Sequence, residues 1–227
     1  MLLILASPAF ANDVSAGYLF PGAGASAKGS ASVGVSGGML FGGGDGTTFL
    51  TLDASVAPTE RLGFRVSFLT GGEGSPTAGL AGGAVGVRYL VVDTEKLRVA
   101  PFAAGGVGAL TGEQALGGLA AGLSLEAGGK NVWFDCSVPL VGALISPDGF
   151  AEDNVAVIGF PLTALGSELG VNAKVAEHHH FRAGLASAVP VLSYRYQNEH
   201  WYLGVTGGTL PIGATLSALS IQGGARF

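Results

Sequence analysis

One serine lies in a pattern that many hydrolases use to present a nucleophile. Gly34, Ser36 and Gly38 match the G-x-S-x-G elbow, in which a sharp turn between a strand and a helix exposes the serine hydroxyl. That chemistry also needs a histidine and an acid beside the serine. No helical pattern follows Ser36, and a chain with 40 glycines produces such matches by chance. We therefore assign no catalytic residue.

Histidines gather in two polar segments. His178, His179 and His180 follow Glu177, and His200 lies in a similar segment further on. Adjacent imidazoles beside a carboxylate can bind a metal when a flexible turn brings them together. A polar turn between two strands explains the same residues more simply. We therefore assign no metal site and no cofactor.

The composition is that of an apolar chain with little charge. Its 227 residues suit one domain, 40 of them are glycine, 12% are charged, and the mean hydropathy is +0.49. A disordered glycine-rich chain would be polar, so these apolar groups need a core or a lipid phase. The net charge of −5 leaves no basic surface for nucleic acid. Cys136 is the single cysteine, which excludes an intrachain disulfide and a four-cysteine zinc site.

The first residues resemble the end of a secretory signal. Residues 1–11 form a short apolar run that closes on Ala9-Phe10-Ala11, an A-x-A cleavage pattern. We predict that residues 1–11 are a signal-peptide remnant and that the mature chain starts at Asn12. An apolar first strand or helix is the alternative.

No later segment has the length and apolarity of a membrane-spanning helix. The nearest candidate, Val99–Leu125, is interrupted by Glu113 and Gln114. In lipid every backbone polar group must be paired internally, which leaves a closed barrel as the other permitted structure. An exported apolar chain without a spanning helix therefore favours a β-barrel.

Apolar residues alternate with small or polar ones along most of the chain, which predicts strands. Breaks rich in Gly and Pro separate runs of about 10 residues, the length that crosses a bilayer at a tilt. The first predicted strand is Gly29–Phe41 and the last is Gly213–Phe227. The pattern predicts about 12 strands, or ten if the poorly patterned Val155–Leu165 is not a strand. One strand is expected to run through Phe181–Val191.

The fold predicted from these runs is an all-β, closed, antiparallel up-and-down transmembrane barrel. Residues 12–28 form a lead-in, and the strands occupy residues 29–227. No internal repeat beyond the hairpin rhythm and no linker between domains is visible.

Charges within the predicted strands all fall on the face opposite the Leu, Val and Phe face. About one charge per strand, with Gly, Ala and Ser around it, suits a narrow lumen rather than a sheet that faces water. A soluble sandwich would carry several charges on each strand. We therefore predict that the following residues face the lumen: Asp53, Arg65, Arg88, Arg98, Glu126, Asp135, Glu168, Lys174, Arg182 and Arg226.

Aromatic residues lie close to several predicted strand ends. Such positions are typical of the aromatic girdles at the two interfaces of a membrane barrel, and ordinary core packing is the alternative. The residues concerned are Tyr18, Tyr89, Trp201 and Phe227.

The C-terminal strand carries a resemblance to a known class. Leu219, Ile221 and Phe227 lie on one face, Gln222 and Arg226 lie on the other, and the chain ends on Phe227. This strand resembles the closing strand of bacterial outer-membrane β-barrel proteins. The resemblance implies location in the cell outer membrane, contact with its lipid, and reading of the Phe227 strand by the barrel-assembly machinery.

The charges predicted to face the lumen allow two interpretations of function. Six are basic and four are acidic, which suits either a mildly anion-preferring pore or paired charges that plug a narrow barrel. The predicted function is a non-enzymatic outer-membrane barrel, either structural or a small porin-like channel. The alternatives are a barrel enzyme acting on lipid and a secreted soluble β-sandwich.

Overall fold

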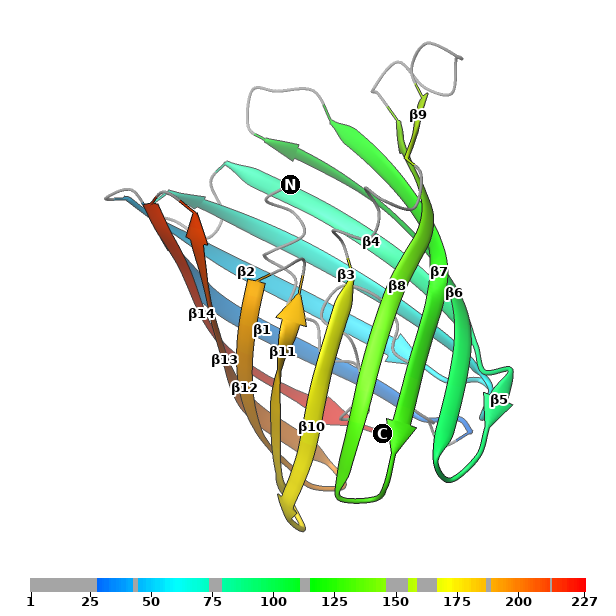
Figure 1. Cartoon of the computed structure of the whole chain (residues 1–227). Coiled ribbons are helices and arrows are strands. Elements are labelled where there is room, and N and C mark those ends of the chain that lie inside the picture. The colour runs from blue at the N-terminus through cyan, green and yellow to red at the C-terminus, as the bar shows by residue number, and fades with distance from the viewer. Residues whose placement is uncertain are drawn as a thin grey trace.

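The computed structural model describes residues 28–42, 45–73, 79–110, 115–145, 155–158, 167–186, 189–212 and 214–227. None of their elements is a helix able to span a membrane. Within these residues twelve antiparallel strands form a closed ring (Figure 1). In chain order they are β1 (Ala31–Gly42), β2 (Asp45–Val56), β3 (Leu62–Glu73), β4 (Leu80–Tyr89), β6 (Leu97–Leu110), β7 (Leu116–Gly128), β8 (Val132–Ile145), β10 (Glu168–Ala176), β11 (His179–Ala186), β12 (Val189–Gln197), β13 (Trp201–Ile212) and β14 (Ala214–Arg226).

Two pairings close the ring. β14 lies antiparallel to β1, and beyond their ladder Phe227 N–H donates to the Ala31 carbonyl over 2.8 Å. The lower part of β8 pairs with β10, so that Asp135 lies opposite Gly170. Closure leaves no exposed sheet edge along these pairings, which is the condition for a sheet to cross a membrane.

The predicted number of strands is confirmed, although two of the segments were assigned wrongly. The predicted strand Phe181–Val191 is the hairpin of β11 and β12. Ser187 and Ala188, which lie between the two strands in the sequence, carry no Gly, Pro or Asn turn signal. Val191 faces the lumen whereas Phe181 faces outward, so the phase of the alternation changes between the two strands.

The described part of the predicted strand Val155–Leu165 is not part of the ring. Its described residues form β9 (Val155–Ile158), which pairs only with the upper end of β8. β5 (Val92–Asp93) is a second short strand outside the ring and pairs with the start of β6. The helix candidate Val99–Leu125 lies instead in β6 and β7. These two strands pair in one continuous register.

The ring is lower on one side than on the other. β10, β11 and β12 have 8 or 9 residues, whereas β6 and β8 have 14. The upper end of β8 therefore pairs with β9 rather than with β10. Even the short strands come close to the length that crosses a bilayer at a tilt.

Short turns and the C-terminus lie at the same end of the barrel, the lower end in Figure 1. Residues 129–131, 177–178 and 198–200 form the turns there. Outer-membrane barrels place their short turns on the periplasmic side, so we assign this end to the periplasm. The even number of described ring strands returns the C-terminus to that side.

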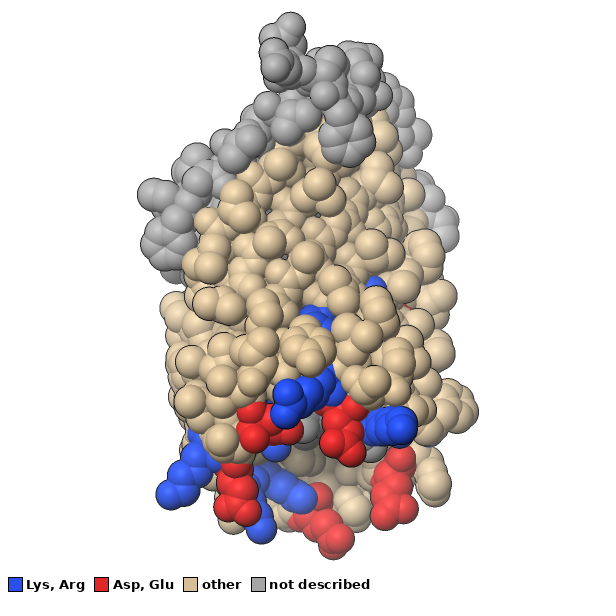
Figure 2. Space-filling view, turned by 90° about the vertical axis from the view of Figure 1, so that its right-hand side faces the viewer, with Lys and Arg blue, Asp and Glu red and all other residues tan. Residues whose placement is uncertain are grey.

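The outer wall is apolar over most of its height. Outward side chains such as Val35, Phe68 and Leu203 are about half exposed. Figure 2 shows the charged side chains of one face gathered towards the periplasmic end, below an almost uncharged wall. Such a surface is stable against hydrocarbon and costly against water, so it is the surface that lipid covers.

Glycines on the inner wall provide room for large side chains that lie across it. A Cβ on Gly34 would overlap the Tyr202 hydroxyl, and one on Gly224 would lie 2.6 Å from the Tyr202 ring. Gly170 lies under the Arg182 guanidinium in the same way, at 2.7 Å from its Nε. The glycine content therefore reflects the filling of a narrow lumen.

Gly34→Ala is expected to destabilise the barrel by about 1–3 kcal/mol, because the added methyl group overpacks the Tyr202 hydroxyl. Adding Tyr202→Phe removes that oxygen, so the double variant should lose less than the sum of the two single variants. Gly37→Ala on the same strand is the control, since its nearest neighbour would lie at 3.7 Å. Urea titration in lipid vesicles measures the free energy of unfolding of the wild type and of these four variants. Equal losses for Gly34→Ala and Gly37→Ala would contradict the packing of Tyr202 against β1.

Candidate functional site: a charged layer in the lumen

Strand register lines up the inward polar residues in rows that cross several strands. Each residue of a row is paired directly with the next, so the row follows from the period-two alternation and the closure. One row is Asn172, Arg182, Ser193, Thr206 and Ser220. The next row towards the periplasm is Lys174, His180, Arg195, Gly204, Gln222, Ser36 and Thr51.

Asp135 of β8 is the centre of the first charged group. Arg182 donates from Nη2 to its Oδ2 over 2.6 Å and from Nε to its Oδ1 over 3.2 Å. Asn172 Nδ2 also donates to Oδ1 of Asp135. Glu168 Oε2 lies 3.9 Å from Arg182 Nη2, and Glu168 is fully buried. Burial of these charges is tolerable because each has an opposite charge and hydrogen-bonding partners.

Asp53 and Arg65 form the second charged group, on β2 and β3. Arg65 Nη2 lies 3.4 Å from Asp53 Oδ1, and Ser67 Oγ donates to the same oxygen over 2.6 Å. In the ring β3 lies almost opposite β10, so the inward Arg65 and Glu168 lie on facing walls of the lumen. The two groups therefore form one charged layer, made of Asp53, Arg65, Asp135, Glu168 and Arg182, all of them buried.

The other charges predicted to face the lumen lie outside this layer, close to the periplasmic mouth. Arg98 Nη1 donates to Glu126 Oε1 over 2.6 Å, and its Nε donates to Asp93 Oδ1 over 3.2 Å. Arg226 Nη1 donates to the Asn198 carbonyl over 3.4 Å. Arg88 lies on the inner face opposite Gly63, and Lys174 lies opposite His180.

Arg195 and Tyr202 also belong to the inner surface, and the sequence interpretation missed them. Arg195 points inward near the end of β12 and is almost fully buried. Its Cζ lies 5.4 Å from the centre of the Tyr202 ring, and its Nη1 donates to Gln197 Oε1 over 3.1 Å. The signal was present, because Arg195 alternates with the outward Tyr194 and Tyr196.

Above the charged layer, towards the outer end of the barrel, the large side chains of the described inner wall are mostly apolar, with Thr51 of β2 as one polar exception. Leu69 lies four residues after Arg65 on β3, and Val191 lies four residues before Arg195 on β12. Both are therefore on the same inner face and further from the periplasm. Phe49 and Phe102 are buried on the inner face in the same region. Porin lumens are polar and filled with water, so this outer half differs from an open aqueous pore.

The G-x-S-x-G match has no elbow around it. Ser36 lies in the middle of β1, which continues straight to Gly42. Its hydroxyl is hydrogen-bonded to Thr51 Oγ1 and is buried in the lumen wall. A nucleophile elbow needs a turn into a helix, so this serine lacks the geometry for nucleophilic attack.

The histidine tract begins in the turn before β11 and packs into an aromatic cluster at the periplasmic rim. His179 Nδ1 is hydrogen-bonded to the Tyr194 hydroxyl at 2.9 Å, and His178 Nδ1 to the Gln197 carbonyl at 3.1 Å. The rings of Tyr196 and Trp201 lie 5.2 Å apart in the same cluster. Among the described residues no group of three His, Cys, Asp or Glu is arranged to hold a metal.

Exposed aromatic residues at the same end suit a girdle at the membrane interface. Tyr89 ends β4, Trp201 begins β13, and Phe227 follows β14, and each is exposed. The Tyr and Trp rings, which have one polar edge, favour this boundary between lipid and water. Tyr18, the fourth predicted member, and the predicted signal remnant and lead-in up to residue 27 lie outside the described residues.

Two solved structures of outer-membrane channels share the barrel architecture. The COG4313 outer membrane channel from Pseudomonas putida F1 is 12% identical with a TM-score of 0.56, and the match covers 91% of this chain and 99% of that chain. The KdgM porin in complex with disordered oligogalacturonate is 11% identical with a TM-score of 0.53, covering 84% and 97%. No protein-family model and no curated protein sequence matches the chain.

Likeness at this level of identity shows the fold alone. Together with the closed ring and the apolar wall, it defines the chain as a β-barrel of the bacterial outer-membrane type. The predicted fold class and the predicted resemblance are both confirmed.

Proposed function

We propose that the protein is a small, non-enzymatic channel of the outer membrane, narrowed in its periplasmic half by the charged layer. The observation that carries this proposal is the burial of all five charged side chains of the layer although they point into the lumen, since side chains packed in this way from facing walls leave little free cross-section. The apolar outer half of the lumen adds a second barrier to ions, because apolar walls do not replace their hydration shells.

The pairing of charges favours a constriction over a strongly selective pore. In the layer, Arg65 faces Asp53, and Arg182 faces both Asp135 and Glu168. Paired charges cancel much of the field that would draw one sign of ion into the lumen. We therefore expect low conductance with weak selectivity between anions and cations.

The last strand supports a proposal about assembly. β14 is amphipathic over its described length, and Phe227 projects at the periplasmic end with 78% of its surface exposed. We propose that the barrel-assembly machinery reads this strand and that outer-membrane lipid then surrounds the wall.

Single-channel recording in planar bilayers tests the channel. Arg65→Ser should raise the conductance several-fold over the small wild-type value, because it shortens a long side chain of the charged layer. Ser67 still donates to Asp53 in this variant, so the fold should survive. Tyr202→Ala is a second enlarging variant, and Arg61→Ser in an exposed turn is the control.

An unchanged conductance in the Arg61→Ser control and larger values in the other two variants would support the proposal. Folded wild type and folded enlarging variants that all fail to conduct would replace it with a purely structural barrel.

A further inference from the structure

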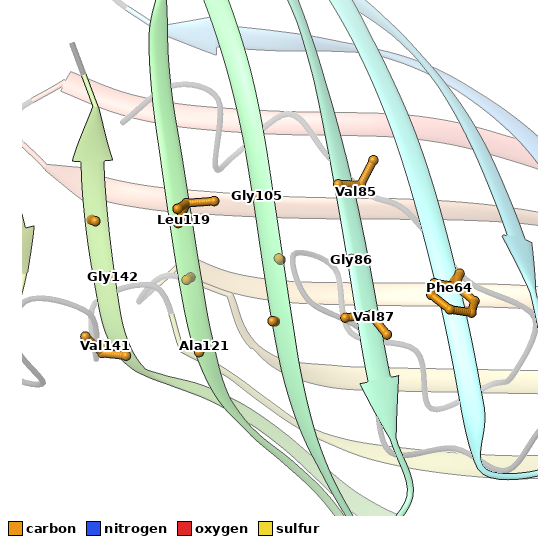
Figure 3. A pocket seen from close by; sticks show the side chains of 13 residues that line it. Phe64, Val85, Gly86, Val87, Gly105, Leu119, Ala121, Val141 and Gly142 are labelled. Atoms are coloured by element: carbon orange, nitrogen blue, oxygen red, sulfur yellow. The ribbon is translucent and has the colours of Figure 1, made fainter. Parts of the chain in front are cut away.

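A groove of about 650 Å³ runs across the outer wall over β4, β6, β7 and β8 (Figure 3). Two neighbouring rows of outward residues line most of it. The lower row is Phe64, Val87, Ala103, Ala121 and Val141, and the upper row is Val85, Gly105, Leu119 and Ala143.

The groove exists because small residues lie between large ones on the same face. Ala103 and Gly105 on β6 form its floor, with Val85 on one side and Leu119 on the other. Leu119 leans over this floor, since a Cβ on Gly105 would lie 2.6 Å from Leu119 Cδ2. The inward residues behind the floor are also Gly and Ala, so this part of the wall is little more than backbone.

The groove faces the membrane and is lined by hydrocarbon. Phe64, Val85 and Leu119 point outward in register with the apolar wall, and each is between 42% and 60% exposed. None of the lining residues is polar. Its volume lies within the range of ordinary ligand pockets. A polar solute has no partner here, whereas a hydrocarbon chain fits both the shape and the chemistry.

The position of the groove on the wall indicates which leaflet of the membrane supplies the lipid. Phe64 is the third residue of β3 after the periplasmic turn, and Val87 lies two residues before the periplasmic end of β4. Gly105 and Leu119 lie further from the periplasm, and Leu119 is the fourth residue of β7 from its outer end. The groove thus begins near the periplasmic interface and rises into the hydrocarbon region, as a lipid chain does from its headgroup.

We propose that this groove holds one acyl chain of a phospholipid from the periplasmic leaflet. Lipid tails are as apolar as the wall, so the gain comes from van der Waals packing of the chain against the floor rather than from the hydrophobic effect. Such a chain is more ordered than bulk lipid and exchanges more slowly. The proposal needs only a membrane-spanning barrel and holds whether or not the lumen conducts.

Photo-crosslinking tests the groove directly. The full chain is reconstituted in phosphatidylethanolamine vesicles that contain a small share of the same lipid with a diazirine midway along one acyl chain. After illumination, mass spectrometry maps the adducts along the chain. We expect several-fold more adducts on β6 and β7 around Ala103, Gly105 and Ala121 than on the outward residues of β11 and β13.

Filling the groove supplies the matched comparison. Ala103→Leu and Ala121→Leu add apolar side chains to the floor and should abolish the excess of adducts, while the barrel still folds because the added groups face lipid. Ala183→Leu, on an outward exposed residue of β11, should leave the excess unchanged.

Two results would overturn the proposal. One is an even distribution of adducts around the wall that the floor substitutions do not alter. The other is a floor that is protected from lipid adducts in barrels that a bifunctional reagent crosslinks to one another, which would assign the groove to a second copy of the chain. Absence of channel current would not affect either readout, so this test and that of the proposed function fail independently.

Discussion

Asp135→Ala is expected to destabilise the folded barrel by about 3–5 kcal/mol. Arg182 donates two hydrogen bonds to this carboxylate, and Asn172 donates a third. Without Asp135, the nearest carboxylate to the buried guanidinium is that of Glu168, whose Oε2 lies 3.9 Å from Arg182 Nη2. An uncompensated buried charge costs more than the original pair contributed. Urea titration in lipid vesicles, followed by the migration of unheated samples on a gel, measures the change.

Two companion variants separate burial of charge from loss of contact. The double variant Asp135→Leu with Arg182→Met should recover most of the stability, because replacing a buried pair by apolar groups is often neutral. Asp93→Ala removes a partly exposed partner of Arg98 and should cost less than about 1 kcal/mol. A loss for Asp135→Ala as small as that for Asp93→Ala would contradict the buried layer.

Val205→Arg is expected to destabilise the barrel by about 2–4 kcal/mol, the cost of a basic side chain at mid-depth on the lipid face. Val205 lies near the middle of β13, and its side chain is exposed on the outer wall between Leu203 and Gly207. In water such a substitution at an exposed strand position would change stability little. The same urea titration measures it.

Val205→Leu is the control and should be nearly neutral, because one apolar side chain replaces another against lipid. A protein that tolerates arginine at position 205 as well as leucine would have a wall that faces water. That outcome would favour the soluble β-sandwich over the membrane barrel.

Much of the fold could be predicted because two surroundings of opposite polarity act on every strand. The lipid phase admits apolar residues and the lumen admits small and polar ones, so the alternation records which face is which. The strand with Phe64 outward and Arg65 inward shows this directly, and Pro58 marks the turn before it. Strand ends could be read wherever Gly or Pro interrupts the pattern.

The errors in the fold come from places where local signals are weak. Ser187 and Ala188 separate β11 from β12 without a turn signal, and the valines that follow are apolar although they face the lumen. A prediction based on alternation alone therefore treats the two strands as one. β9 pairs only with the upper end of β8, a consequence of the shortness of the neighbouring strand β10.

The geometry of the site depended on information that no local pattern holds. Alternation places Arg65 and Glu168 on inner faces, but their position on facing walls of the lumen depends on how the ring closes and how its strands are staggered. Tyr202 was also on the inner parity, yet its reach over Gly34 needs the pairing of β14 with β1. Closure is a property of the whole chain rather than of any one strand.

The most direct test of the central claim is the folding of the chain from Asn12 into lipid vesicles, read by circular dichroism and by gel migration before and after boiling. A membrane-spanning barrel predicts strand-type dichroism in lipid and a shift in migration on boiling, with aggregation in plain buffer. A chain that folds in plain buffer and migrates identically before and after boiling would contradict the membrane barrel.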